Sequence, residues 1–187
     1  MNDIIKACHL HVTNYLKPGM VALDATAGNG SDTTLLAHCV GPTGRVYALD
    51  IQEQALNATR ELLALNGVSQ RVRLLQESHD RLGELMAEPI NLIMFNLGYL
   101  PGGDKTITTH CISTMKALDD ALRLLVPGGL LSVVTYSGHP GGREEEEEVA
   151  NWVAGLSSRE FSALSMRFMN KPNRPPCLWL VKKASVK

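Results

Sequence analysis

Apolar segments rich in β-branched residues alternate with segments of helical periodicity along the chain. Strands are predicted at residues 20–26, 44–50, 71–76, 90–96, 130–136, 160–169 and 177–183, and helices at 6–16, 31–40, 52–67, 80–87, 108–126 and 143–156. Such alternation predicts a parallel sheet with helices on both faces. Residues 170–176 are too few for a crossover helix, so the last two strands should pair antiparallel. We therefore predict an α/β, doubly wound, seven-stranded, mostly parallel sheet with an antiparallel C-terminal pair.

The size of the chain suits one domain over residues 1–187, with a sizeable core. Its apolar runs are too short to span a bilayer, and its start shows no secretion signal, which predicts a cytoplasmic protein without membrane contact. The four cysteines form no CxxC pair, so reduced thiols are expected rather than a zinc site. His9 and His11 cannot share one helix face, which argues against a metal pair. We therefore expect no metal.

The formal net charge of −1 argues against a protein that coats long stretches of nucleic acid, and we expect no DNA partner. A local basic patch that binds a small RNA element remains compatible with this charge. The five glutamates of residues 144–148 are interpreted as a solvated helix start. An exposed sheet edge or helix face would support a homodimer.

The first predicted strand ends in "LDATAGNGSDT", at the sheet edge where such folds bind ligands. Gly28 and Gly30 allow a tight turn and a close approach to a ligand. A dinucleotide fingerprint would place a third glycine at position 33, where this chain has threonine. The carboxylate of Asp24 suits an ammonium group better than a pyrophosphate. The predicted ligand contacts in this stretch are Asp24, Thr26, Gly28, Asn29, Gly30 and Asp32.

The second predicted strand ends at Asp50, whose carboxylate could accept hydrogen bonds from both hydroxyls of a ribose. The alternative is that Asp50 caps the following helix. Gln52 could line the same pocket. Ser78 and His79 follow the third strand, where an adenine would lie beside the ribose. The alternative there is a capped turn, with Asp80 capping the short helix.

These pieces resemble class I S-adenosylmethionine-dependent methyltransferases, which have a Rossmann-like fold. "DATAGNG" is similar to their first motif, Asp50 to their ribose acid, and "FNLGY" to the catalytic motif after the fourth strand. "DATAGNGSDT", "FNLGYLPGGDK" and "YSGHPGG" together resemble a small bacterial family long labelled rRNA methylases. That family includes an enzyme that methylates 5-aminomethyl-2-thiouridine at the tRNA wobble position. The resemblance covers nearly the whole chain and implies S-adenosylmethionine as cofactor and a tRNA anticodon stem-loop as partner.

Amino-group methyltransferases commonly carry Asn or Asp, then Pro-Pro, then Tyr or Phe, where this chain has Asn96-Leu97-Gly98-Tyr99. The Asn96 side-chain oxygen and the Leu97 carbonyl could accept the hydrogens of an amine and direct its lone pair at the sulfonium methyl. A carboxylate would favour the ammonium form, which has no lone pair, and a neutral amide avoids this. Tyr99 could stack on a flipped-out base. The alternative is an Asx-turn followed by a surface aromatic residue.

Further predicted substrate contacts come from three loops. They are Gly102, Asp104 and Lys105 behind the catalytic motif, Tyr136 and His139 after the fifth strand, and Lys171 and Arg174 between the last two strands. His139, also a candidate catalytic residue, could accept a proton from the amine or hold a phosphate. A simple turn and an exposed charged hairpin are the alternatives for the first and third loops.

Three other functions fit the sequence less well. They are methylation of another RNA or small-molecule amine, a cofactor- or RNA-binding module without catalysis, and a nicotinamide oxidoreductase. The presence of both Asp50 and Asn96 argues against the module. The missing third glycine argues against the oxidoreductase.

Overall fold

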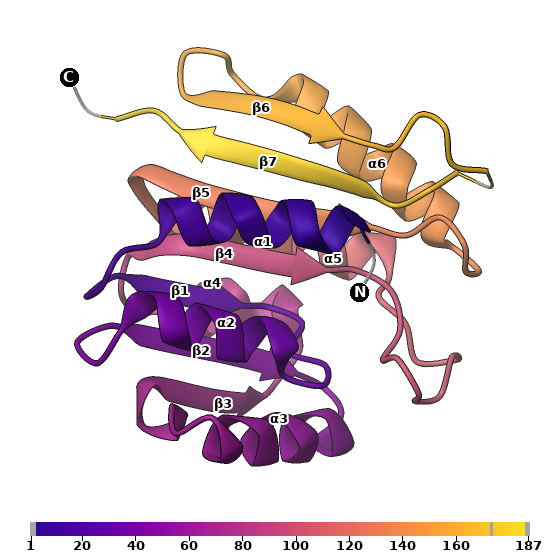
Figure 1. Cartoon of the computed structure of the whole chain (residues 1–187). Helices are drawn as coiled ribbons and strands as arrows, with labels where there is room; N and C mark the ends of the chain where they lie inside the picture. Colours follow the sequence, from indigo (N-terminus) through magenta and orange to yellow (C-terminus); the bar gives the residue numbers. More distant parts are fainter. Residues whose placement is uncertain (1–2, 173, 186–187) are drawn as a thin grey trace.

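A computed structural model describes residues 3–172 and 174–185. These residues form one seven-stranded sheet in the order β3-β2-β1-β4-β5-β7-β6 (Figure 1). The strands are β1 (Val21–Asp24), β2 (Arg45–Asp50), β3 (Val72–Gln76), β4 (Ile90–Asn96), β5 (Leu125–Thr135), β6 (Phe161–Met166) and β7 (Cys177–Lys183). Neighbouring strands among β1–β5 are parallel, and β7 is antiparallel to β5 and β6. The predicted mostly parallel sheet with its antiparallel C-terminal pair is confirmed.

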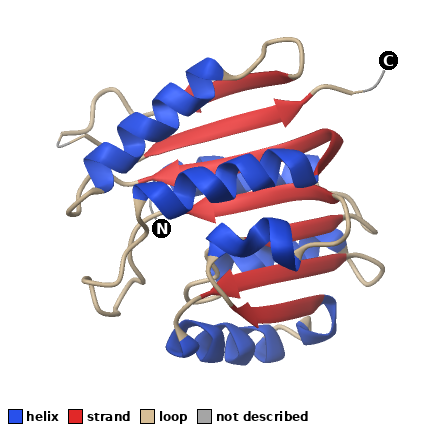
Figure 2. Cartoon of the chain, turned by 180° about the vertical axis from the view of Figure 1, so that it is seen from behind, coloured by secondary structure: helices blue, strands red, loops and turns tan. Residues whose placement is uncertain are grey.

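Helices cover both faces of the sheet. One face carries α1 (Asp3–Tyr15), α2 (Ser31–Val40) and α3 (Glu53–Leu65), and the other carries α4 (Leu82–Leu85), α5 (Cys111–Leu124) and α6 (Gly142–Gly155). Figure 2 shows the sheet from behind the view of Figure 1. Two short 3₁₀ turns, Ser69–Arg71 and His79–Arg81, precede β3 and α4. No helix among the described residues is long and apolar enough to cross a membrane.

The central strand β4 shows why the run "INLIMF" is continuously apolar. Its side chains alternate between two cores: Leu92 and Met94 pack with α1 and α2, while Ile93 and Phe95 pack with α5. All four are fully buried. A strand covered on both faces cannot show the polar alternation of a half-exposed strand. The carboxyl end of β4 is therefore rigidly held, and it carries Asn96.

The structure corrects the predicted end of the fifth helix. The helix was expected over residues 108–126, stopped by Pro127-Gly128-Gly129, but α5 spans Cys111–Leu124 and the chain enters β5 at Leu125. The Pro-Gly-Gly lies inside β5, where the register with β4 shifts between Ile90 and Leu92. A strand tolerates proline and glycine at such an irregularity, so these residues mark a break in register.

The run of glutamates at the start of α6 is only partly solvated, which corrects a second expectation. Glu145 and Glu146 are buried, with 2% and 4% of their surface exposed. Glu145 accepts hydrogen bonds from the hydroxyls of Thr109 (2.8 Å) and Thr114 (2.6 Å), and Glu146 is paired with Arg167 at 2.8 Å. Because a helix turns about 100° per residue, a run of one residue type must place some members inward. Here the inward carboxylates are matched by donors.

Candidate functional site

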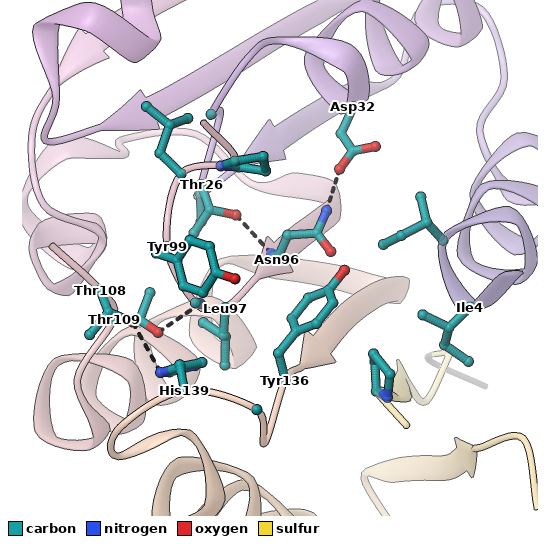
Figure 3. A pocket seen from close by; sticks show the side chains of 18 of the residues that line it. Ile4, Thr26, Asp32, Asn96, Leu97, Tyr99, Thr108, Thr109, Tyr136 and His139 are labelled. Atoms are coloured by element: carbon teal, nitrogen blue, oxygen red, sulfur yellow. Dashed lines mark hydrogen bonds between the residues drawn. The ribbon is translucent and has the colours of Figure 1, made fainter. Parts of the chain in front are cut away.

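A cavity of about 1180 Å³ lies at the carboxyl edge of the sheet, where β1 separates β2 from β4. Ligands bind at this point in doubly wound folds because the crossovers leave it open. The predicted site residues that line it are Thr26, Gly28, Asn29, Asp32, Asp50, Gln52, Ser78, His79, Asn96, Tyr99, Tyr136, His139, Lys171 and Arg174. The predicted residues outside its lining are Asp24, Gly30, Gly102, Asp104 and Lys105. Figure 3 shows the part of the cavity around Asn96.

The loop after β1 packs tightly against α3. Gly30 has φ 81°, and a Cβ there would lie 2.7 Å from the Cα of Thr59. The Thr59 hydroxyl donates to the carbonyl of Gly28 at 3.0 Å. Glycine is therefore required at position 30 for conformation and for close packing, and Gly30 shapes the loop from behind the cavity wall.

Asp50, at the end of β2, holds the neighbouring turns with both carboxylate oxygens. Its Oδ2 accepts from the backbone N–H of Gly28 and its Oδ1 from that of Gln52, each at 2.9 Å. The helix cap is at Gln52 and not at Asp50, so the alternative role as helix cap is wrong. A carboxylate oxygen has two lone pairs, so each retains one for a ligand. Asp50 can therefore bind two hydroxyls in the cavity.

Asp24 lies behind the cavity wall and is 1% exposed. Its oxygens accept from the Thr33 hydroxyl (2.6 Å) and the Thr26 backbone N–H (3.2 Å). Burial, with a further contribution from the charge of Asp32, raises its pKa from 3.8 to about 7. The two donors lower the pKa but do not offset the loss of solvation. Asp24 is therefore largely protonated below neutral pH.

This raised pKa predicts a pH-dependent stability. Between pH 4 and 7 folded Asp24 binds a proton that the unfolded chain releases, so raising the pH lowers the free energy of unfolding. We expect wild type to lose on the order of 3 kcal/mol more stability than Asp24→Asn between pH 5 and pH 8, measured by urea unfolding. Equal losses in the two proteins would show that Asp24 ionises normally.

Asn96 is held from two sides at the end of β4. Its backbone N–H donates to the Thr26 hydroxyl at 2.7 Å, and its side-chain Nδ2 donates to Asp32 Oδ2 (Figure 3). The other oxygen of Asp32, Oδ1, lies 2.5 Å from His9 Nε2 on α1. Asn96 Oδ1 is buried and has no hydrogen-bond partner among the described residues. The arrangement offers a fixed neutral acceptor to a ligand with an N–H or O–H donor.

The loop after β4 extends from the sheet and returns along itself (Figure 1). Tyr99 and Thr108 form a β-bridge, and the Thr109 hydroxyl accepts from the Gly98 N–H at 2.9 Å while donating to Glu145. The buried carboxylate of α6 thus holds the base of the loop. Tyr99 remains 39% exposed at the cavity.

The tip of this loop lies away from the cavity lining. The Asp104 carboxylate accepts from the backbone N–H and hydroxyl of Thr106, which lowers its pKa. Lys105 Nζ lies 5.6 Å from the centroid of the Tyr99 ring, a cation–π distance. Gly102, Asp104 and Lys105 are therefore not part of the cavity in this structure, and only Lys105 is linked to it, through Tyr99.

Tyr136 and His139 close the cavity on the β5 side. Burial is the main cause that raises the pKa of Tyr136 to about 12, and the charge of Asp32 adds to it, so its hydroxyl stays protonated. His139 packs edge-on to Tyr99, with centroids 6.1 Å apart. His139 Nδ1 lies 3.0 Å from the Pro140 carbonyl and 3.3 Å from the Thr108 hydroxyl. His139 Nε2 is buried and has no hydrogen-bond partner among the described residues.

Ser78 and His79 lie beside the end of β3 and line the cavity. His79 is 9% exposed, and burial lowers its pKa, so the ring is neutral at pH 7. It packs edge-on to Phe95 at 6.0 Å. The predicted cap by Asp80 is absent, because the 3₁₀ turn that contains Asp80 has no side-chain cap and leads directly into α4. A neutral ring and a hydroxyl form an uncharged wall.

Lys171 and Arg174 line the cavity, with Lys171 beside the first turn of α1 and Arg174 beside α6. Lys171 Nζ lies 3.7 Å from Asp3, and Arg174 Nη1 lies 3.4 Å from Glu147. All four side chains are about half exposed. Exposed ion pairs of this kind are weak, so both cations can exchange their partners for another anion.

Sequence reasoning missed several residues of the site, among them His9, Thr108 and Thr109 in the cavity lining and Glu145 behind it. His9 comes from α1, and its contact with Asp32 spans 23 positions, so no local pattern indicates it. Glu145 was hidden in a glutamate run. The described residues hold no group of three or more His, Cys, Asp or Glu side chains placed for a metal ion, and the four cysteines are free.

Comparisons with known proteins identify the family to which the chain is similar. Residues 46–182 match the family described as "Putative rRNA methylase". The chain is 38% identical to the tRNA (mnm(5)s(2)U34)-methyltransferase, chloroplastic, of Arabidopsis thaliana, over 95% of this chain and 69% of that protein.

Two crystal structures are similar over nearly their whole length. A "putative rRNA-methylase" from Clostridium thermocellum has a TM-score of 0.93 and 38% identity, with 98% of each chain covered. A protein from Streptococcus mutans described as "a putative methyltransferase", in complex with SAH, has a TM-score of 0.87 and 35% identity, covering 96% of this chain and 97% of that one.

Proposed function

The chain belongs to the rRNA methylase family, and from this premise we propose that it methylates the 5-aminomethyl group of 2-thiouridine at the tRNA wobble position. It is a methyltransferase, and its cofactor is S-adenosylmethionine. The finer assignment of the acceptor is supported above all by Asn96 Oδ1, a buried neutral acceptor without a partner among the described residues. The 38% identical relative named for this wobble nucleoside supports it independently.

The cofactor half of the cavity has groups that fit a nucleoside. The remaining lone pairs of Asp50 would accept from the two ribose hydroxyls, and the wall of Ser78 and His79 would lie against the adenine. Asp24 was expected to receive the ammonium group of the cofactor. Because Asp24 is buried and largely protonated, we propose that Asp32, which lines the cavity, is the carboxylate nearer to that group.

The acceptor half supports transfer to nitrogen. We propose that Asn96 Oδ1 and the Leu97 carbonyl accept the two hydrogens of the amine, so that its lone pair points at the methyl group. The nitrogen forms a bond to the methyl carbon, the carbon–sulfur bond breaks, and its electron pair stays on sulfur as S-adenosylhomocysteine forms. The methylated ammonium then loses a proton to water, because His139 Nε2 is buried beside Gly142.

Contacts with RNA would be few and local. The exposed ring of Tyr99, flanked by His139 and Lys105, would stack on a flipped-out base. Lys171 and Arg174 would exchange Asp3 and Glu147 for phosphates. An unpaired anticodon loop suits these contacts because its bases can be splayed out.

The substrate itself provides the test. We expect a stem-loop with 5-aminomethyl-2-thiouridine to be methylated nearly as well as full-length tRNA, measured by transfer of labelled methyl from S-adenosylmethionine. The same stem-loop with unmodified uridine should be inert, because it has no amine lone pair to attack the methyl group. Nucleoside analysis of tRNA from a deletion strain should show the aminomethyl precursor accumulating. Methylation of ribosomal RNA with no reaction on the modified stem-loop would contradict the proposal.

A further inference from the structure

The side-chain amide of Asn96 has two possible orientations that are nearly equal in shape. They differ in whether the oxygen or the NH₂ group faces the cavity, and only the first can accept from an amine. The neighbouring Asp32 distinguishes them, because its Oδ2 accepts from Asn96 Nδ2 in the observed orientation. Turning the amide would bring its oxygen against a carboxylate oxygen. Asp32 therefore selects the orientation in which Oδ1 points away from Asp32, on the Tyr136 side, and has no hydrogen-bond partner among the described residues (Figure 3).

Asp32 in turn depends on α1. Its Oδ1 lies 2.5 Å from His9 Nε2, and the two side chains are only 14% and 16% exposed. A pair this sheltered from water is less weakened by solvent than a surface pair. The helix that carries His9 is itself anchored, because Cys8 and Val12 are fully buried in the core under α1. A series of contacts therefore connects the core, through His9 and Asp32, to Asn96.

We propose that His9 is a positioning residue for methyl transfer, which acts through Asp32 to keep the Asn96 oxygen facing the acceptor amine. This inference rests on the proposed function of Asn96 and extends the site to a helix that precedes the sheet. His9 lines the cavity wall, yet it acts on the reaction through Asp32 and not by contact with the reacting atoms.

The first test compares turnover of three variants on the modified stem-loop. His9→Ala should lower kcat about tenfold with KM for S-adenosylmethionine within about twofold, because lost orientation affects the transition state. His9→Gln should keep most of the activity, since its amide can donate to Asp32. His11→Ala is the matched control on the same helix, outside the cavity lining, and should equal wild type.

A second test does not depend on the RNA. Sinefungin carries an amine where the cofactor carries its methyl group, and S-adenosylhomocysteine carries neither group. The ratio of the two affinities therefore measures how well a hydrogen-bond acceptor, here Asn96 Oδ1, faces that position. By calorimetry, His9→Ala should lower this ratio about fivefold or more relative to wild type and to His11→Ala, and His9→Gln should restore it. Circular dichroism would verify that each variant is folded.

The outcomes separate this inference from the proposed function. An unchanged kcat and an unchanged ratio in His9→Ala would overturn the role of His9 while leaving amine methylation intact. An equal loss of affinity for both ligands would make His9 a support of the cofactor site only, which also overturns the inference. If wild type does not methylate the stem-loop, the proposed function fails, and the affinity ratio still decides whether His9 orients Asn96.

Discussion

Replacing Asn96 by alanine should reduce turnover on the modified stem-loop by about a hundredfold or more, with much less change in cofactor affinity. The amide provides the acceptor that we propose aligns the amine, and alanine leaves that nitrogen free to rotate and to keep its water. The measurement is the rate constant of methyl transfer in a single turnover, with S-adenosylhomocysteine affinity determined by calorimetry. A variant that binds cofactor normally and still turns over near the wild-type rate would remove Asn96 from the mechanism.

Asn96→Asp is the matched variant of the same size. A carboxylate at this position would stabilise the ammonium form of the acceptor, which has no lone pair, so the optimum of activity should move to higher pH. It would also meet the carboxylate of Asp32, which now accepts from the amide NH₂. An optimum that stays in place or falls would show that the charge at position 96 does not control the protonation of the amine.

Replacing Asp50 by alanine should weaken cofactor binding by about tenfold or more. Each hydrogen bond to a charged group contributes roughly 1.5–3 kcal/mol, and a ribose would form two with this carboxylate. The variant also frees the N–H groups of Gly28 and Gln52, which loosens the turns that follow β1 and β2. Calorimetry with S-adenosylhomocysteine measures the loss.

Two variants sharpen this result. Asp50→Asn keeps the size and one acceptor oxygen, so its loss should be smaller than that of alanine. Asp104→Ala removes a carboxylate outside the cavity lining and should change cofactor affinity by less than about twofold. An unchanged affinity in folded Asp50→Ala would exclude this residue from the ribose site.

The sequence predicted the site best for residues whose position is determined by the end of a strand. Asp50 and Asn96 are the last residues of β2 and β4, and parallel strands bring their carboxyl ends to one edge, so their shared cavity could be predicted without coordinates. The antiparallel pairing of the last two strands could be predicted for a related reason, since a short connection permits only one relative direction. These inferences depend on chain direction and length, which a sequence contains.

The burial of a side chain, and its contacts with residues distant in the sequence, could not be predicted in this way. Asp24 is near the glycine loop in sequence, but the Thr33 hydroxyl holds it inside the fold, and spacing alone does not distinguish a buried carboxylate from one in a cavity wall. The direction of the Gly102–Lys105 turn is likewise set by Asp104 and its own bonds to Thr106. From the sequence, the amide of Asn96 was explained only by the need to keep the methyl-accepting amine neutral. The structure adds a second reason, because the NH₂ group of the amide donates to Asp32.

The place of β7 between β5 and β6 has a consequence for how the polypeptide folds. Because β6 precedes β7 in the chain but pairs only with it, β6 has no hydrogen-bonded neighbour until β7 has joined the sheet. The edge of β5 is open for the same interval, and an open edge invites pairing with other chains. Substitutions that slow the addition of β7 to the sheet should therefore favour aggregation during refolding.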